Sequence, residues 1–274
     1  MPFLPCCLHC SFIVLRFIGT PNPPKKYNMF SFLKKHPFAV EAFFEHSVVL
    51  TFAVPKAQLE AIIPECLALD TFQDQWAFLA IALVQTRGLR PKGFPIFMGN
   101  DFFLIGYRIF VRYTNNAGKR LRGLYILKSE TDKRKMEYLG NLFTQYNYST
   151  TDITQQQTPG ELVIQSKQSD FRLAFREITV DATLPQGSPF ADWKEARQFA
   201  GPLPNTLTYD AQRKEVLIIE GLRKNWTPKP LQVFDYHFAF LETLPIEKPI
   251  LANAFIMHNI PYTWKKGRTE IWKP

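Results

Sequence analysis

Apolar positions recur in strand-length runs, several with a two-residue period, through most of the chain from residue 46 onward. Such runs, rich in Val, Ile, Phe and Tyr and separated by turn-forming residues, are typical of β-strands. Two pairs of them flank the short turn-forming segments 73–75 and 115–118, which predicts two hairpins. The predicted strands are 47–54, 67–72, 76–86, 102–113, 121–129, 146–153, 161–167, 171–180, 206–209, 215–221, 233–241 and 253–260.

Three short helices interrupt these strands. The first begins at Pro55, carries an apolar stripe at positions 59, 62 and 63, and ends at Pro64. The second begins at the capping-box sequence 129–132 and shows an apolar face at positions 136, 139 and 143. The third has Ser188 as its cap and ends at Gly201.

Segment 87–101, with three glycines and two prolines, is expected to be a long loop. Because helices do not alternate regularly with strands, the pattern indicates an α+β, mainly antiparallel β domain rather than a doubly wound parallel sheet. A single domain is expected over residues 29–274.

The first 28 residues have a different character. Three of the four cysteines, an apolar run at 12–18 and a turn-rich stretch at 20–28 precede a fresh start at Met29. We expect an unstructured tail, or a mis-assigned start, that packs against nothing. Cys6, Cys7, His9 and Cys10 lie too close together to surround one tetrahedral metal ion, so no metal site is expected.

Composition excludes several classes of protein. With 46% hydrophobic and 21% charged residues, the chain is neither disordered nor collagen-like nor a coiled coil. No run of about 18 apolar residues predicts a membrane span. Cys66 alone falls within the folded body, so no disulfide framework is available there, which predicts a reducing, cytoplasmic location.

The net charge of +9 is concentrated near residues 1–28, 119–135 and 263–274. The sequence contains no known nucleic-acid-binding motif, so we interpret these segments as solvated basic patches and expect no nucleic-acid partner. It also contains no Gly-rich phosphate loop and no nucleophile elbow, and no cofactor is predicted.

Several stretches of the body resemble a known family in the same order along the chain. These are 48–55, 63–64, 67–72, 107–111, 123–127, 201–204 and 261–264. They are similar to the YqjF-like family, an uncharacterised group placed in the acetoacetate decarboxylase-like superfamily. The resemblance covers about residues 40–268. It implies a cone-shaped antiparallel β-barrel with a few short helices around a small-molecule cavity, in agreement with the predicted strands.

The same resemblance raises the question of whether the catalytic lysines of the decarboxylases are present in this sequence. Decarboxylases of this superfamily use a lysine, activated by a neighbouring lysine, that forms an imine with a β-keto acid. The pair follows the helix, and here the corresponding segment 141–148 contains no lysine. Pro24-Lys25-Lys26 lies outside the resemblance. Imine decarboxylation is therefore not expected.

Polar residues on the predicted strands supply the candidate site. Arg108 and its neighbour Tyr107 lie in a matched stretch and are the candidate ligand-binding residues. If Arg108 faces a cavity, its guanidinium can hold a carboxylate through two hydrogen bonds. The alternative places it on a solvated face. Lys128 is a weak candidate catalytic residue, because alternation puts it on the face of Leu124 and Ile126, but it can equally be exposed at the end of its strand.

The remaining titratable residues have structural interpretations. Glu130 and Asp132 are expected at the start of the second helix, where carboxylates stabilise the helix dipole. His237 and His258 have no neighbours with nucleophile or ligand spacing. Two functions remain: a non-catalytic cavity for a small apolar or carboxylate ligand, or an enzyme of lyase or hydrolase type acting on a small oxo or carboxylic acid.

Overall fold

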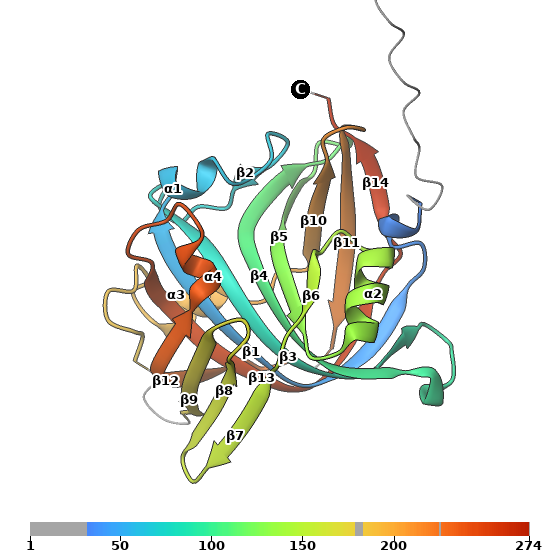
Figure 1. Ribbon diagram of the computed structural model, residues 1–274. Helices are drawn as coiled ribbons and strands as arrows, with labels where there is room; N and C mark the ends of the chain where they lie inside the picture. Colours follow the sequence, from blue (N-terminus) through green and yellow to red (C-terminus); the bar gives the residue numbers. More distant parts are fainter. Residues whose placement is uncertain (1–31, 179–182, 225, 274) are drawn as a thin grey trace, which may run out of the picture.

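The computed structural model describes residues 32–178, 183–224 and 226–273 (Figure 1). The expectation for residues 1–28 lies outside these residues. Among them, no helix is long and apolar enough to cross a membrane.

Strands dominate the described chain, and all but two of their pairings are antiparallel. The expected α+β, mainly antiparallel β class is confirmed. The strands are β1 (Val40–Pro55), β2 (Ala68–Leu69), β3 (Trp76–Pro91), β4 (Asn100–Thr114), β5 (Arg120–Thr131), β6 (Tyr148–Thr150), β7 (Thr154–Thr158), β8 (Glu161–Ser166), β9 (Phe171–Glu177), β10 (Asn205–Asp210), β11 (Glu215–Arg223), β12 (Lys229–Phe238), β13 (Ile250–Trp264) and β14 (Arg268–Ile271).

The helices are short. They are α1 (Ala57–Glu60), α2 (Arg134–Phe143), α3 (Trp193–Ala200) and α4 (Ala239–Glu242), with two 3₁₀ turns, η1 (Leu33–Lys35) and η2 (Ile96–Met98). The amphipathic helix α2 turns Met136 inward, while Tyr138 on its other face is exposed.

Seven of the described strands close on themselves. The order β11-β10-β5-β4-β3-β1-β13 runs through paired neighbours, and β13 pairs again with β11 at Gly221↔Trp264. Because side chains alternate between the two faces of a strand, each member presents one set of residues to the inside of the ring and the other to the outside.

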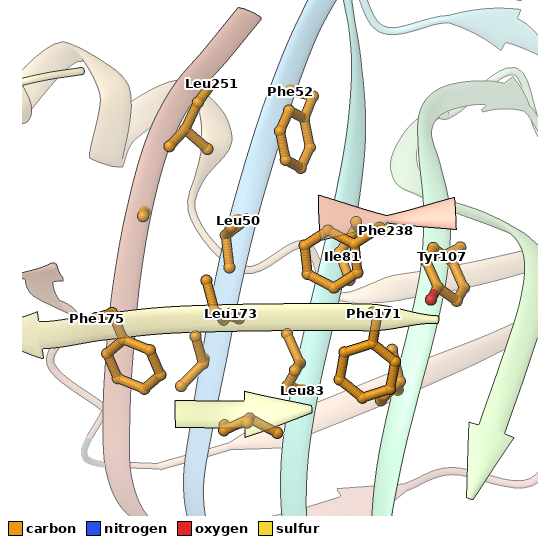
Figure 2. Packing of buried hydrophobic residues seen from close by; sticks show 14 of the residues in the cluster. Leu50, Phe52, Ile81, Leu83, Tyr107, Phe171, Leu173, Phe175, Phe238 and Leu251 are labelled. Atoms are coloured by element: carbon orange, nitrogen blue, oxygen red, sulfur yellow. The ribbon is translucent and has the colours of Figure 1, made fainter. Parts of the chain in front are cut away.

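The outer face of β13, β1, β3 and β4 is covered by a second layer, made by β12, β9 and β8. Figure 2 shows Phe171, Leu173 and Phe175 of β9 crossing over Leu50 and Leu83. These residues are all at most 2% exposed. Burial of apolar side chains of this size stabilises a fold by about 1.5 to 3 kcal/mol each, so this double layer holds the strands on which the inner face is built.

The first hairpin and the loop at 87–101 differ from expectation. Segment 67–72 forms the two-residue strand β2, which pairs with β4 rather than with β3, although an isolated bridge joins Phe72 to Trp76. The glycines of 87–101 do not break the chain into one loop, because β3 continues to Pro91 and β4 begins at Asn100. The second hairpin is confirmed, with its turn at Asn115–Gly118.

Two predicted helix starts are also wrong. β5 runs on through Thr131, so Ser129 and Glu130 belong to the strand, and α2 begins after Lys133 without a side-chain cap. For α3 the cap is Asp192, whose carboxylate accepts from the Glu195 amide at 2.8 Å. Ser188 instead donates to the carbonyl of Ala252 at 2.7 Å. For α2, pairing of β5 with β4 overrides the local capping-box motif. For α3, a capping residue nearer to the helix, Asp192, replaces Ser188.

Candidate functional site

The ring encloses a cavity of about 110 Å³. Every one of the seven strands contributes to its lining, from Ser47 of β1 and Ala82 of β3 to Thr206 of β10. The segment from Ala200 to Pro204, between α3 and β10, also lines the cavity. A cavity that holds benzene in another protein measures about 150 Å³, so this one has room for a compact ligand of a few non-hydrogen atoms.

The lining is apolar apart from two arginines, three tyrosines and a few hydroxyl groups. No acidic residue, histidine or lysine is present among the described residues that line it. The arginines are Arg108 and Arg223, and the tyrosines are Tyr146, Tyr148 and Tyr262. Such a composition, a largely hydrophobic wall with a few convergent polar groups, is typical of small-molecule sites.

Arg108 lies in the middle of β4 and faces the cavity together with Leu104 and Phe110. Its Nε atom is shielded from solvent and has no hydrogen-bond partner among the described residues. Desolvation lowers the pKa of its guanidinium, electrostatic interaction with Tyr262, Tyr146 and Tyr148 opposes that shift, and the charge of Arg223 adds to it. Among the described residues no carboxylate pairs with this arginine, and a desolvated cation without a counter-ion is costly.

A glycine leaves the space in which the Arg108 guanidinium lies. A Cβ atom built on Gly106 would be 2.8 Å from both Nε and Nη2 of Arg108. This is closer than non-bonded atoms approach, so a larger residue at position 106 would displace the guanidinium. The position of the cation in the cavity therefore depends on Gly106.

Arg223 is the second cation, at the end of β11. It donates to the carbonyl oxygen of Pro202 at 2.5 Å and lies over the rings of Trp226 and Tyr262, 5.6 and 5.9 Å from their centroids. Desolvation lowers the pKa of its guanidinium, and interaction with the Tyr262 side chain partly offsets that shift. No ion pair with a described carboxylate is formed by Arg223 either.

The three tyrosines bring hydroxyl groups to the same space. The hydroxyl of Tyr146 lies 2.6 Å from that of Thr206. Burial raises the pKa of all three phenols, that of Tyr148 to about 12, so they are neutral near pH 7. Tyr262 interacts electrostatically with both Arg108 and Arg223. A neutral phenol can accept from a guanidinium and can donate to an anion, but it is not a counter-ion.

Asp70 shows how the same fold neutralises other arginines. Its carboxylate is fully buried and accepts from Nε of Arg112 at 2.5 Å and from Nε of Arg122 at 2.6 Å. Arg112 shares a strand face with Arg108, four residues away, yet of these two arginines Arg112 alone contacts the Asp70 carboxylate. Neither cation of the cavity has such a carboxylate beside it among the described residues.

Comparison with known proteins identifies the family. The profile of the domain-of-unknown-function family 2071, described as an uncharacterized conserved protein, matches residues 41–268. The chain belongs to this family. The expected resemblance is confirmed. No curated protein sequence matches the chain.

Solved structures with the same fold are acetoacetate decarboxylase-like. The acetoacetate decarboxylase of Legionella pneumophila has a TM-score of 0.55 at 12% identity, over 85% of this chain and 88% of that one. An acetoacetate decarboxylase-like enzyme of Sphingomonas wittichii gives 0.51 at 12% identity, over 84% and 92%. The enduracididine biosynthesis enzyme MppR complexed with pyruvate gives 0.53 at 10% identity, over 86% and 92%. At these identities the likeness establishes the fold alone.

In this family member, the segment after α2 reaches the cavity with tyrosines. The resemblance to decarboxylases raised the question of a lysine pair there, and the segment instead contributes Tyr146 and Tyr148 to the lining. The Asn141 side chain holds this turn, because it both accepts from the amide of Tyr148 at 2.8 Å and donates to its carbonyl at 2.9 Å.

Lys128 lies on the opposite face of β5 from the one that strict alternation predicts. The pairing of β4 with β5 shifts by one residue, so that Tyr107 is opposite Lys128 whereas Arg108 is opposite Ile126. This β-bulge at Leu127 reverses the alternation. Leu124, Ile126 and Ser129 line the cavity, and Lys128 does not.

Tyr107 also lies on the outer face, apart from Arg108. It is 1% exposed, packs against Phe240 with ring centroids 4.5 Å apart, and donates to Oε2 of Glu130 at 3.1 Å. Oε1 of Glu130 accepts from Lys128 at 2.8 Å and from the Ser169 hydroxyl at 2.6 Å. The structure therefore brings Tyr107, Lys128 and Glu130 together in a polar cluster with all partners satisfied, separate from the cavity.

The other residues singled out in the sequence serve the fold. Glu130 is a buried strand residue rather than a helix-start carboxylate. Asp132 accepts from the amide of Phe103 at 2.7 Å. His237 contacts Asp170 and Glu242 at the surface, and His258 lies 2.5 Å from Glu177. None of the four lines the cavity.

Arg223 and the three tyrosines were not predicted as site residues. Tyr262 lies within a matched stretch, 261–264, which could have drawn attention to it. Arg223 ends a strand among polar residues and looks like a surface cation. Only closure of the ring between β11 and β13 brings it beside Tyr262.

Proposed function

We propose that the cavity binds a small carboxylate, which Arg108 and Arg223 hold by charge-assisted hydrogen bonds. The single observation that carries this proposal is the pair of desolvated guanidinium groups without a carboxylate partner among the described residues. Arginine matches carboxylate geometry through paired donors. A bound anion would supply the partner that Asp70 supplies to Arg112 and Arg122.

The proposal is a binding site without Schiff-base decarboxylase chemistry. Imine formation needs a free amine in the cavity, and the described lining offers guanidinium groups and phenols. General acid–base catalysis is most efficient with a pKa near the working pH, whereas the pKa of Tyr148 is raised to about 12 and those of its neighbours are also raised. These properties favour binding over catalysis on an oxo or carboxylic acid.

The first prediction tests this assignment by ligand-induced stabilisation. A ligand at about 100 times its Kd adds about 2.7 kcal/mol of stability, equivalent to roughly 5 to 10 °C in Tm for a domain of this size. In a thermal-shift screen with acetate, propionate, butyrate, pyruvate and acetoacetate, we expect at least one such shift. Arg108→Met should abolish it, because a thioether cannot donate to a carboxylate.

Arg112→Met is the matched control. Arg112 lies on the same strand and face but is bound to Asp70, so this variant should lose stability and still show the carboxylate shift relative to its own Tm. Equal shifts in the Arg108→Met variant and the parent would contradict the proposal.

A further inference from the structure

A second pocket adjoins the arginine cavity. Its volume is about 270 Å³, and it lies between α2, the residues before β1, and the adjoining ends of β3 and β4. Its wall is mostly apolar, with Phe38, Val40, Leu89, Phe102, Leu139 and Phe143 among its members. We call it the apolar pocket.

The apolar pocket and the arginine cavity are neighbours that share part of their lining. Four residues line both of them: Leu104, Tyr146, Tyr148 and Trp264. Tyr146 and Tyr148, whose ring centroids are 6.4 Å apart, belong to the segment that follows α2. A ligand whose charged end lies at Arg108 therefore has the apolar pocket as the adjoining space for the rest of its structure.

The apolar pocket has no free charge in its described lining. Arg90 is bound to Glu41 at 2.7 Å. His36 is 5% exposed, and burial lowers its pKa to about 4, so its ring is neutral near pH 7. Asn100 and Thr144 donate to backbone carbonyls, of Leu89 at 3.2 Å and of Gly140 at 2.7 Å. Nε2 of His36 and Oγ1 of Thr86 are buried without a hydrogen-bond partner among the described residues. Neither atom is charged, so the space favours an uncharged, mostly apolar group.

The geometry points to one class of ligand: a monocarboxylic acid with an apolar body of roughly six to ten carbons, its carboxylate at Arg108 and Arg223 and its body in the apolar pocket. This inference rests on the proposed function. Two observations support it independently of each other, the uncompensated guanidinium pair at one end and the uncharged wall at the other. The combined volume of the cavity and the pocket exceeds roughly 300 Å³, the lower end of the range for small-molecule sites.

The experiment is a chain-length series. Saturated straight-chain carboxylates from two to ten carbons are titrated into the full chain by isothermal titration calorimetry. Each methylene that enters an apolar site contributes enough to tighten binding about three- to fourfold. We expect affinity to rise by this factor per carbon beyond the shortest acids, and then to level off when the pocket is full.

Two variants separate the pocket from the cavity. Leu139→Trp and Leu89→Trp add bulk from α2 and from β3, at residues that line only the apolar pocket. Both should keep the binding of acetate and butyrate and lose the gain for longer acids, by at least tenfold at eight carbons. Leu222→Trp is the matched control: Leu222 is 44% exposed and lines neither space, so it should behave as the parent.

The outcomes are distinguishable. If acids of two to four carbons bind and longer ones gain nothing, the inference is wrong and the proposed function stands. If no acid of any length binds, the proposed function fails and the inference with it. Should either tryptophan variant fail to fold, the series in the parent still decides.

Discussion

Arg108 and Arg112 project from the same face of β4 and differ in their counter-ions. Arg112 has the buried carboxylate of Asp70, whereas among the described residues the groups that interact electrostatically with Arg108 are tyrosines and a second arginine. In the proposed function, a bound carboxylate takes the place beside Arg108 that Asp70 takes beside Arg112. This contrast is the basis of the proposed site.

The second prediction concerns Lys128 and imine chemistry. Its Nζ atom lies 2.8 Å from a Glu130 carboxylate oxygen, on the face of β5 that does not line the cavity. An ammonium in such a pair is not the free amine that attacks a ketone. Incubation with acetoacetate and cyanoborohydride should therefore leave the intact mass unchanged. Stoichiometric labelling that disappears in a Lys128→Arg variant would refute this.

At the scale of single residues, the sequence predicted one of the two arginines that line the candidate site. Arg108 could be selected because it lies in a strand whose alternation is regular up to Phe110. Lys128 was placed on the wrong face because a bulge at Leu127 breaks the alternation, and nothing in Leu124-Tyr125-Ile126-Leu127 signals an extra residue. Local patterns give the period of a strand, but its register depends on the neighbouring strand.

At the scale of elements, Asp70 joins β2 to β4 and β5. It follows β2 directly and holds Arg112 of β4 and Arg122 of β5. β2 itself has only two residues. The ion pairs of Asp70 therefore help to hold this segment against β4, the strand that carries Arg108, and against the neighbouring β5.

The third prediction follows from that role. Asp70→Asn leaves Arg112 and Arg122 without their buried carboxylate. Because these arginine side chains are 30% and 35% exposed, water partly replaces it, and the expected loss is about 2 kcal/mol, as for hydrogen bonds to charged groups. Urea denaturation should show a loss of this size. Asp74→Asn is the control, because the ion pair of Asp74 with Lys56 is exposed and should contribute less than about 1 kcal/mol. Equal losses in the two variants would contradict this account of Asp70.

The predicted elements were most accurate where pattern and pairing agree. The hairpin of β4 and β5 was found from alternation and from Asn115-Asn116-Ala117-Gly118. The start of α2 was misplaced, because pairing with β4 extends β5 through the capping-box sequence. Tertiary pairing of this kind overrides a local helix-start signal, and a single sequence does not contain it.

At the scale of the whole molecule, ring closure makes the site. Arg108 on β4 and Arg223 on β11 are separated by more than a hundred residues, and they line one cavity because β11 pairs with β13. The resemblance to the decarboxylase-like superfamily supplied this fold, whereas strand periodicity alone gives no order of strands. The second arginine was missed for the same reason.

The fourth prediction concerns the pH dependence of stability. The His36 backbone ties the start of the described chain to the end of α2, where its amide donates to the carbonyl of Phe143, and to the segment before β14, where its carbonyl accepts from the amide of Gly267. Burial lowers the pKa of its ring from 6.5 to about 4. The unfolded chain therefore binds a proton that the folded chain does not between these values, so stability is complete above about pH 6.5 and falls as the pH decreases toward 4.

For a shift of this size, the loss between pH 7 and pH 4.5 is about 2 kcal/mol. His36→Asn, which accepts the positive φ of 51° at this position, should remove that part of the pH dependence in urea denaturation. His237→Gln should retain it, because His237 is exposed at the surface. If the free energy of unfolding changes equally with pH in the parent, His36→Asn and His237→Gln proteins, His36 is not the group that causes this pH dependence.

The most direct test of the central claim is to locate a carboxylate in the cavity. Crystals of the full chain soaked with 3-bromopropionate would give an anomalous bromine signal. We predict one bromine inside the ring, with the carboxylate oxygens about 3 Å from guanidinium nitrogens of Arg108 and Arg223. Bromine found only at surface lysines, with the cavity holding water alone at a saturating concentration of the acid, would contradict the account.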